Sequence, residues 1–312
     1  MPIIKPEEMN FSDKNIIMII SGLPGTGKTT LALSAPDVLL IDTDEGMARV
    51  NPAHRKDASI CKTYEEILAD LKAAEGTYKS IVIDTCGALI EYMKDWAMRT
   101  DPKSSKKDGG FSLQGYGVIK SEFIRLSAEL RKKFNVVYLF HENMTKQDET
   151  VFYELVVEGA TRTLVYQPAD LAAHLFIQNG RRYLGFTPTE QYSAKSAYGI
   201  KGLIEVPELK DGDHNDFLTK LFAKVRANLA AESASIAPEK EAYDKAMELF
   251  RKVIADIKTP ENVMSTVQLI KVTKHGLTSE KEAKAMLKAK MDELGIVWDK
   301  GKKAYVYKDQ TD

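Results

Sequence analysis

Residues 16–36 read IIMIISGLPGTGKTTLALSAP. An apolar run typical of a buried strand comes first, and an apolar run with helical spacing comes last. Between them stands the pattern G-x-x-x-x-G-K-[ST], a loop whose glycines allow successive backbone N–H groups to point at phosphates. Because a strand precedes this loop and a helix follows it, the stretch predicts a bound nucleotide. The loop residues expected to bind it are Gly22, Pro24, Gly25, Thr26, Gly27, Lys28, Thr29 and Thr30.

Two side chains of the loop and one acid outside it predict the cofactors ATP and Mg²⁺. The Lys28 amine can reach the β- and γ-phosphates, and the Thr29 hydroxyl can bind the metal. Magnesium prefers oxygen ligands and usually keeps several waters. The apolar strand predicted at residues 80–84 ends in Asp84, which would hold a metal-bound water. The alternative for Asp84 is the N-cap of the helix that follows.

Polar residues at two further strand ends could take part in hydrolysis. Residues 41–46 read IDTDEG, and residues 139–143 read LFHEN. If the strand before Asp44 and Glu45 neighbours the loop strand, one of these acids could act as the base that activates water. We expect Asp42 to be structural. The alternative for Asp44 and Glu45 is a turn that is rich in acids. His141 could sense the γ-phosphate, and the alternative for it is a structural histidine.

Composition limits the classes of protein that remain. The 312 residues carry a net charge of −1, so no global basic field indicates nucleic acid and any such binding must be local. Two cysteines, Cys61 and Cys86, are too few for a disulfide framework and favour a reducing cytosol. No apolar run approaches the ~20 residues of a membrane helix, and the N-terminus lacks the apolar core of a signal peptide. We therefore expect a cytoplasmic protein without a membrane partner.

The pattern of apolar runs predicts an α/β fold in two parts. Strands alternate with amphipathic helices through residues 1–210, which predicts a mostly parallel sheet covered on both faces, with the ligand at the carboxyl ends of the strands. Residues 211–312 read as a mainly helical unit that ends in a hairpin. Within it, AAESASIAPEK at residues 230–240 is expected to be a linker between two helices.

The order of these parts resembles the RecA-like ATPases, in particular the phage-encoded P-loop nucleotide-binding proteins related to single-strand annealing recombinases. The resemblance covers residues 14–206 and implies a RecA-like core with weak, Mg-dependent ATPase activity. Asp44 stands where the family usually has glutamate, with Glu45 displaced by one. The segments that carry the resemblance are GLPGTGKT (22–29), LLIDTDEG (39–46), IVIDTCGAL (81–89), VVYLFHEN (136–143) and YSAKSAYG (192–199).

The last of these segments resembles one whose basic residue reaches the nucleotide of a neighbouring subunit. The resemblance therefore implies that Lys195 acts between subunits of a homo-oligomer.

The same resemblance implies where single-stranded DNA would bind. RecA-like recombinases use two loops, which correspond here to residues 100–117 and 144–158. Lysines for phosphates beside an aromatic ring for base stacking suit sequence-tolerant binding of single strands. The second loop has only Lys146 as a clear cation, and the alternative for the first is a flexible solvated loop. The candidate DNA-binding residues of the first loop are Lys103, Lys106, Lys107 and Phe111.

Two functions from different classes remain open. The first is an ATP-binding protein that acts on single-stranded DNA in phage recombination, by annealing or strand handling, in the cytoplasm of the host cell. A single-strand-binding protein is then a further candidate partner. The second is an ATPase that remodels partner proteins, such as a helicase loader or assembly ATPase, without binding DNA. A small-molecule kinase is disfavoured because no arginine-rich lid follows the core.

Overall fold

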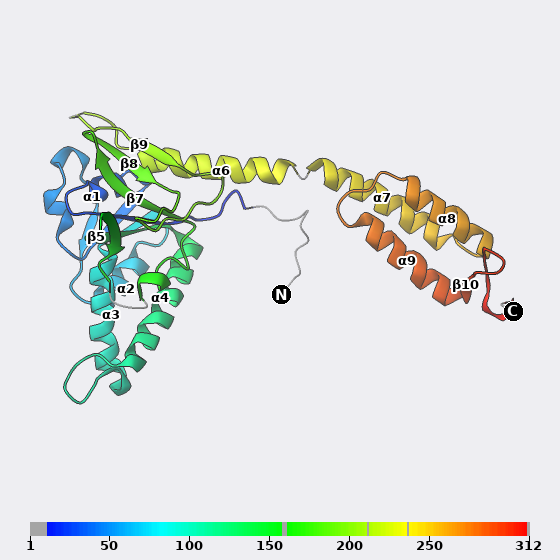
Figure 1. The fold of residues 1–312 in the computed structure, drawn as a ribbon, viewed down its shortest axis with the longest axis horizontal. Coiled ribbons are helices and arrows are strands. Elements are labelled where there is room, and N and C mark those ends of the chain that lie inside the picture. The colour runs from blue at the N-terminus through cyan, green and yellow to red at the C-terminus, as the bar shows by residue number, and fades with distance from the viewer. Residues whose placement is uncertain (1–10, 158–160, 211, 236, 311–312) are drawn as a thin grey trace. The chain divides into compact units, whose positions relative to one another are not determined.

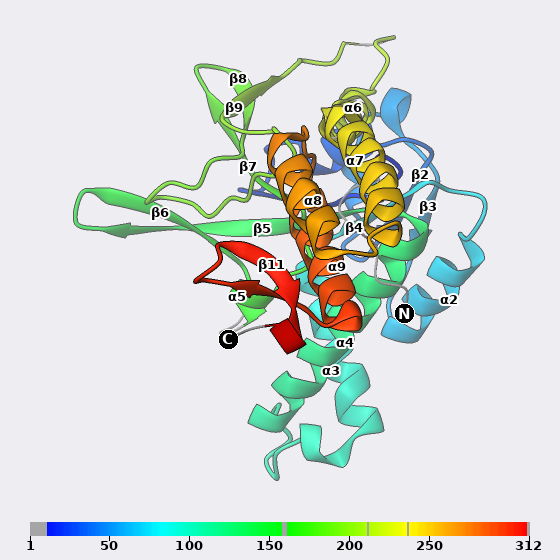
Figure 2. The same cartoon turned by 90° about the vertical axis from the view of Figure 1, so that its right-hand side faces the viewer.

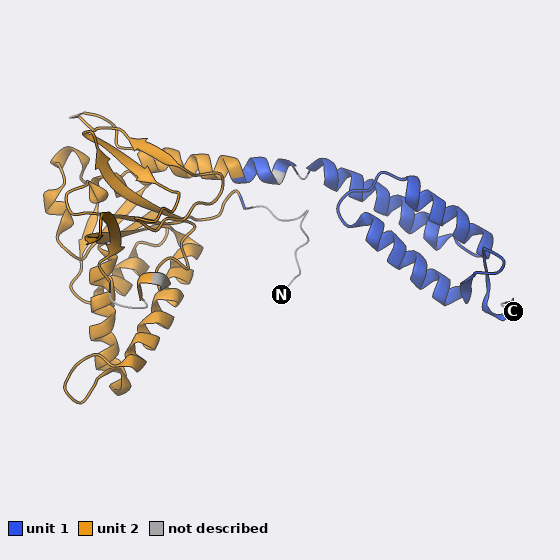
Figure 3. Cartoon of the chain, viewed as in Figure 1, with its two compact units in different colours: residues 1–11, 229–312 blue, residues 12–228 orange. Residues whose placement is uncertain are grey.

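The computed structural model describes residues 11–157, 161–210, 212–235 and 237–310, which form two compact units (Figure 3). Residues 12–228 form one unit, and Phe11 with the described residues from Leu229 onward belongs to the other. No helix in these described ranges is both long and apolar enough to cross a membrane.

The larger unit is built on a sheet whose main path has the strand order β3-β2-β4-β5-β1-β7-β8-β9. The strands from β3 to β7 along this path run parallel, and β8 and β9 are antiparallel additions at one edge. The predicted α/β class with a mostly parallel sheet is confirmed. The strands are β1 (Ile17–Gly22), β2 (Val38–Asp42), β3 (Ala58–Ile60), β4 (Ser80–Asp84), β5 (Asn135–Gln147), β7 (Leu171–Gln178), β8 (Arg181–Gly185) and β9 (Leu203–Val206).

Helices cover both faces of this sheet (Figure 1). On one face, apolar side chains of the helices join Ile19, Ile83 and Tyr138 of the sheet in a single core. Strands buried on both faces need apolar residues at every position, and this explains the unbroken apolar runs of β1 and β4. The helices of this face are α2 (Tyr64–Ala73), α3 (Cys86–Thr100) and α4 (Leu113–Lys133).

Helix α6 (Phe217–Ser235) lies over the opposite face, and its first turns belong to the larger unit. Leu218 and Phe222 are fully buried, and the Leu218 N–H donates to Oγ of Ser34 at 2.8 Å. These contacts are why the larger unit extends to residue 228, beyond Lys210.

The strand order does not meet the condition set for Asp44 and Glu45, which was that the strand before them neighbours the loop strand. Strand β2 pairs with β3 and β4, and β5 lies between β4 and the loop strand β1. The strand that precedes Asp44 is therefore not a neighbour of the loop strand. Because the carboxyl ends of all these parallel strands meet at one edge, residues after β2 can still reach the loop.

Strand β5 is longer than predicted and continues beyond the sheet. It pairs antiparallel with β6 (Thr150–Leu155) from Glu142↔Leu155 to Gln147↔Thr150, and the two strands form a projecting hairpin arm (Figure 2). The expected loop at residues 144–158 is therefore mostly a hairpin. Its last residue, Glu158, lies outside the described residues.

The described part of the smaller unit contains the end of α6, helices α7, α8 and α9 and a two-stranded hairpin, with a core that includes Phe250, Ile270 and Leu287. The predicted terminal hairpin is confirmed. The predicted linker is wrong in its extent, because α6 runs to Ser235 and α7 begins at Ala237; alanine-rich sequence favours helix there. The elements are α7 (Ala237–Ala255), α8 (Pro260–Val272), α9 (Ser279–Leu294), β10 (Ile296–Asp299) and β11 (Ala304–Tyr307).

Both cysteines are buried and unpaired in the larger unit. Burial raises the pKa of the Cys61 thiol to about 11 and holds that of Cys86 well above its ordinary value.

Candidate active site

The loop between β1 and α1 (Lys28–Ala32) has the backbone geometry that its glycines predict. Gly27 precedes the helix at φ 93°, in the left-handed region that strains other residues. A Cβ on Gly22 would collide with the carbonyl oxygen of Leu175 in the neighbouring strand β7. One glycine is thus required by its dihedral angle and the other by the close approach of a second strand.

The Lys28 side chain lies inside this loop. Its Nζ donates to the carbonyl oxygens of Gly22 at 2.9 Å and Leu23 at 3.0 Å. Burial lowers the pKa of Lys28, although the nearby carboxylates of Asp84 and Glu142 favour its charged form. Phosphate oxygens could replace the carbonyl oxygens as acceptors, and their negative charge would further favour the charged form of the buried amine.

Asp84 and Thr29 come together across the site, from the end of β4 and the start of α1. Oγ1 of Thr29 donates to Oδ2 of Asp84 at 2.6 Å, and Asp84 is only 3% exposed. The N-cap of α3 is Thr85, whose hydroxyl accepts from the Ala88 N–H, so capping does not explain Asp84. Burial raises the pKa of Asp84. A hydroxyl and a carboxylate this close fit the oxygen donors that Mg²⁺ prefers.

Asp44, rather than Glu45, faces the other polar groups of the site. Oδ2 of Asp44 lies 3.3 Å from Nε2 of His141, the last residue of β5 that pairs with β1, and Oδ1 of Asp44 accepts from Nη2 of Arg49 at 2.5 Å. Glu45 is exposed and opens the short helix η2 (Gly46–Arg49) with φ 56°. Asp42 accepts from the backbone N–H groups that start this helix, and this contact gives it the structural role expected of it.

A cavity of about 300 Å³ adjoins the loop and α1. Its size is at the lower end of small-molecule sites, and it offers both apolar walls and polar groups. Sequence reasoning missed it because its lining comes from four separate segments of the chain. These are the loop and α1 (Gly27, Thr30, Leu31), the turn after β2 (Asn51, His54), the β7–β8 hairpin (Leu175, Arg182) and residues 206–220.

Comparison with known proteins agrees with this geometry. A protein-family model described as an AAA domain matches residues 14–198. The chain belongs to this AAA-domain family. It is therefore a P-loop ATPase domain, as the loop predicted.

The other comparisons add no assignment. No curated protein matches the chain. A solved structure with similarity to this AAA domain is the flagellar accessory protein FlaH from Methanocaldococcus jannaschii, at 15% sequence identity and a TM-score of 0.29. The match covers 55% of this chain and 77% of that protein.

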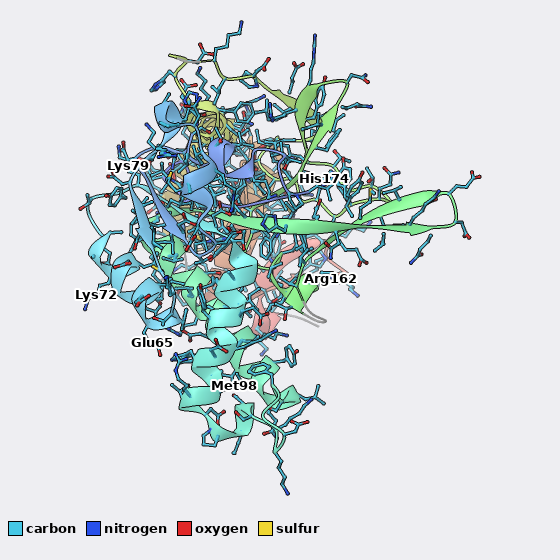
Figure 4. The ribbon with its side chains drawn as sticks, turned by 90° about the vertical axis from the view of Figure 1, so that its left-hand side faces the viewer. Glu65, Lys72, Lys79, Met98, Arg162 and His174 are labelled. Carbon is cyan, nitrogen blue, oxygen red and sulfur yellow. The ribbon has the colours of Figure 1, made fainter. Side chains whose placement is uncertain are left out.

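A buried acid–histidine pair in the AAA domain was not anticipated. Nδ1 of His174 on β7 lies 2.7 Å from Oε2 of Glu142 on β5, outside hydrogen-bond alignment, and both side chains are almost fully buried. The rings of Tyr153 and Tyr192 pack against His174 at the base of the arm (Figure 4). The pair bridges the two strands that flank β1. No local pattern could reveal it, because its members lie far apart in sequence.

Lys195 lies away from the phosphate loop of its own AAA domain. Its Nζ donates to the Ala169 carbonyl at 2.5 Å, and its backbone bridges Ala172 near the start of β7. The loop follows the opposite, carboxyl end of the neighbouring strand β1. A contact between Lys195 and the nucleotide of a neighbouring subunit stays a prediction.

The candidate DNA-binding residues lie at the end of a projecting pair of helices, α3 and α4. Figure 4 labels Met98 near this end, and Figure 1 shows the pair running away from the sheet. The three candidate lysines are exposed. Phe111 is only half-exposed, since its ring packs on Gly115 and meets Tyr116 edge-on at 5.0 Å. The ring therefore faces the helix pair and is poorly placed to stack on a base.

Proposed function

We propose that this ATPase domain binds ATP·Mg²⁺, hydrolyses it slowly, and acts on single-stranded DNA in phage recombination, by annealing or strand handling. The observation that carries the DNA assignment is the cluster of exposed lysines, Lys103, Lys106 and Lys107, at the end of the projecting helix pair. Within the described residues none of the three is in an ion pair, so all three charges are available to phosphates. Phage recombination itself rests on the resemblance of the motifs.

The positions of the site residues support a distinct role for each. Lys28 would bind the β- and γ-phosphates from inside the loop, and Thr29 with Asp84 would hold the metal. A metal held by these two residues would supply positive charge against the negative charge that develops during phosphoryl transfer. Asp44 would accept the proton of the attacking water, and His141, in contact with Asp44, would orient that carboxylate toward the γ-phosphate.

Two features of Asp44 explain why hydrolysis should be slow. Its side chain is one methylene shorter than the glutamate usual in the family that the motifs resemble. In addition, Arg49 engages Oδ1 at 2.5 Å, so part of the carboxylate is already committed to an ion pair. Both features make it harder for the Asp44 carboxylate to reach and activate a water at the γ-phosphate.

The same proposal includes the partners. Lys195 would reach the nucleotide of a neighbouring copy, which requires a homo-oligomer. We include a single-strand-binding protein, which would present the DNA, as a further partner.

The test is equilibrium binding of labelled single-stranded DNA, with and without ATP, across a range of salt concentrations. For single strands, log affinity falls with log salt with a slope of about −0.7 per neutralised phosphate. Replacing Lys103, Lys106 and Lys107 by alanine should weaken binding to every sequence alike and flatten that slope by up to about 2. A matched control replaces three exposed lysines elsewhere on the domain, Lys56, Lys62 and Lys72.

Two outcomes would contradict the DNA assignment. Binding that survives the triple change with its slope intact would move the site elsewhere, first to the lysines of the C-terminal hairpin. ATP binding without any affinity for single strands would favour the second function, remodelling of a partner protein. The exposure of the apolar Leu113 side chain, which is 87% exposed beside the lysines, would support such a protein partner.

A further inference from the structure

Arg182 reaches the phosphate loop from a strand that carries no nucleotide-binding motif. It lies on β8, which is joined to β7 by the tight turn Asn179-Gly180, and β7 pairs directly with the loop strand β1. Because successive side chains of a strand point to opposite faces, Arg181 and Arg182 diverge. Arg181 is 67% exposed and lies 3.5 Å from Glu205, whereas Arg182 turns toward the loop.

The contact with the loop is close and specific. Nε of Arg182 donates to the carbonyl oxygen of Thr26 at 3.0 Å. A Cβ built on Gly27 would lie 3.3 Å from the same nitrogen, so the guanidinium group rests directly on this glycine. Among the described residues, no carboxylate lies within ion-pair distance of Arg182. The Nε bond uses one of the five N–H donors of the guanidinium group.

Arg182 also lines the 300 Å³ cavity beside α1, together with Gly27 and Thr30. If the terminal phosphates of a nucleotide lie at Lys28 and its nucleoside lies in this cavity, its α-phosphate lies between the two. Arg182 lies at that position, since it contacts the loop and forms part of the cavity wall. Planar N–H donors of arginine match phosphate oxygens, and such charge-assisted hydrogen bonds are the strong ones.

We infer that Arg182 binds the α-phosphate of the nucleotide held by its own chain, and that the cavity beside it receives the nucleoside. This inference rests on the proposed binding of ATP at the loop. It adds to the charge of Lys28 a positive charge from β8 that is independent of any neighbouring subunit.

The test measures the affinities of ATP, ADP, AMP and adenosine for the full-length chain, by competition against a fluorescent ADP analogue. Arg182→Ala should weaken ATP, ADP and AMP by a common factor of about 10 to 100, the value of a charged hydrogen bond, and leave adenosine unchanged. Arg182→Lys keeps the charge without the planar donors and should fall in between. Arg181→Ala, on the same strand, is the matched control and should bind all four like the wild type.

Three results would overturn the inference. Equal losses for adenosine and the nucleotides would mean that Arg182 only supports the loop. Losses for ATP and ADP without AMP would exclude the α-phosphate, and an unchanged variant would exclude any contact. Lys28→Ala separates this from the proposed function. If the wild type binds ATP and Lys28→Ala does not, an unaffected Arg182→Ala overturns this inference alone. If the wild type fails to bind ATP, the proposed function itself is wrong.

Discussion

Asp84, the proposed metal anchor, is buried in a way that costs the fold stability when its carboxylate is ionised. Its folded pKa is raised, chiefly by burial, so the folded protein binds more protons than the unfolded chain at pH values just above 3.8. The contribution of Asp84 to stability is therefore fully present below 3.8, and it is lost as pH rises through the folded pKa. At neutral pH the ionised carboxylate is a cost to the fold.

We therefore expect Asp84→Asn to raise the thermal unfolding midpoint at pH 7 without nucleotide, because the amide still accepts from Thr29 and carries no charge. Phosphate release should fall about 100-fold or more, since the metal loses an anionic anchor. Calorimetry and a phosphate-release assay check the two effects. Asp95→Asn, at an exposed position of α3, is the control. A midpoint that drops would show that the charge stabilises the site.

The two acids after β2 should separate in function although they are adjacent. Asp44 contacts His141 and Arg49, whereas Glu45 is exposed. Asp44→Asn should lower the hydrolysis rate by about 10²- to 10⁴-fold, the usual value of a general base, and leave ATP affinity nearly unchanged. Glu45→Gln should hydrolyse ATP like the wild type in the same phosphate-release assay. The reverse result would make Glu45 the base.

At the scale of elements, the end of the α3–α4 pair carries one packed aromatic ring and one exposed apolar side chain. Phe111 packs on Gly115 and Tyr116, while Leu113 is 87% exposed. Phe111→Ala should lower the free energy of unfolding by about 1–3 kcal/mol, below the value for a fully buried ring. The salt slope of DNA binding should not change.

Leu113→Ala is the control for this element, and its effect should stay within about 0.5 kcal/mol. Denaturant titrations measure both changes. Unchanged stability of Phe111→Ala, with a loss of DNA affinity, would restore the base-stacking role.

The order of elements was largely predictable, whereas their pairing was not. The run IVID at residues 81–84 and the run VVYLF at residues 136–140 identify strands because a two-sided sheet demands unbroken apolar residues. No local signal states that β5 lies between β4 and β1, since pairing is decided by contacts far apart in sequence. The extension of β5 past Phe140 was missed because polar residues such as Asn143 and Thr145 follow the apolar run.

The same limit applies to the site. The loop, Thr29 and Asp84 stand in motifs whose spacing reflects their chemistry, so sequence could name them. Arg182 and His174 come near the loop only through the β1–β7 pairing. The choice between Asp44 and Glu45 depended on a turn at φ 56°, which directs the two neighbouring side chains to different surroundings.

For the whole molecule, two units with separate cores should unfold separately. The core of the smaller unit, around Phe250 and Leu287, contains no residue of the nucleotide site. Calorimetry of the full chain should show two transitions, and ATP·Mg²⁺ should shift only the one of the larger unit. At 100 times Kd a ligand adds about 2.7 kcal/mol, and each kcal/mol moves a domain of this size by roughly 2–4 °C. A single transition that shifts as a whole would show that the units unfold together.

The two buried thiols have a practical consequence for optical experiments. With a pKa of about 11, Cys61 is a thiolate in only about one molecule in ten thousand at pH 7, and burial also raises the pKa of Cys86 well above its ordinary value. Maleimide dyes react with exposed thiolates, so they should leave the native protein unlabelled. A cysteine introduced at an exposed position, such as Lys107→Cys, could then carry one fluorophore per chain without removal of either native cysteine. A change in the signal of that dye when ATP binds would report whether the helix pair moves.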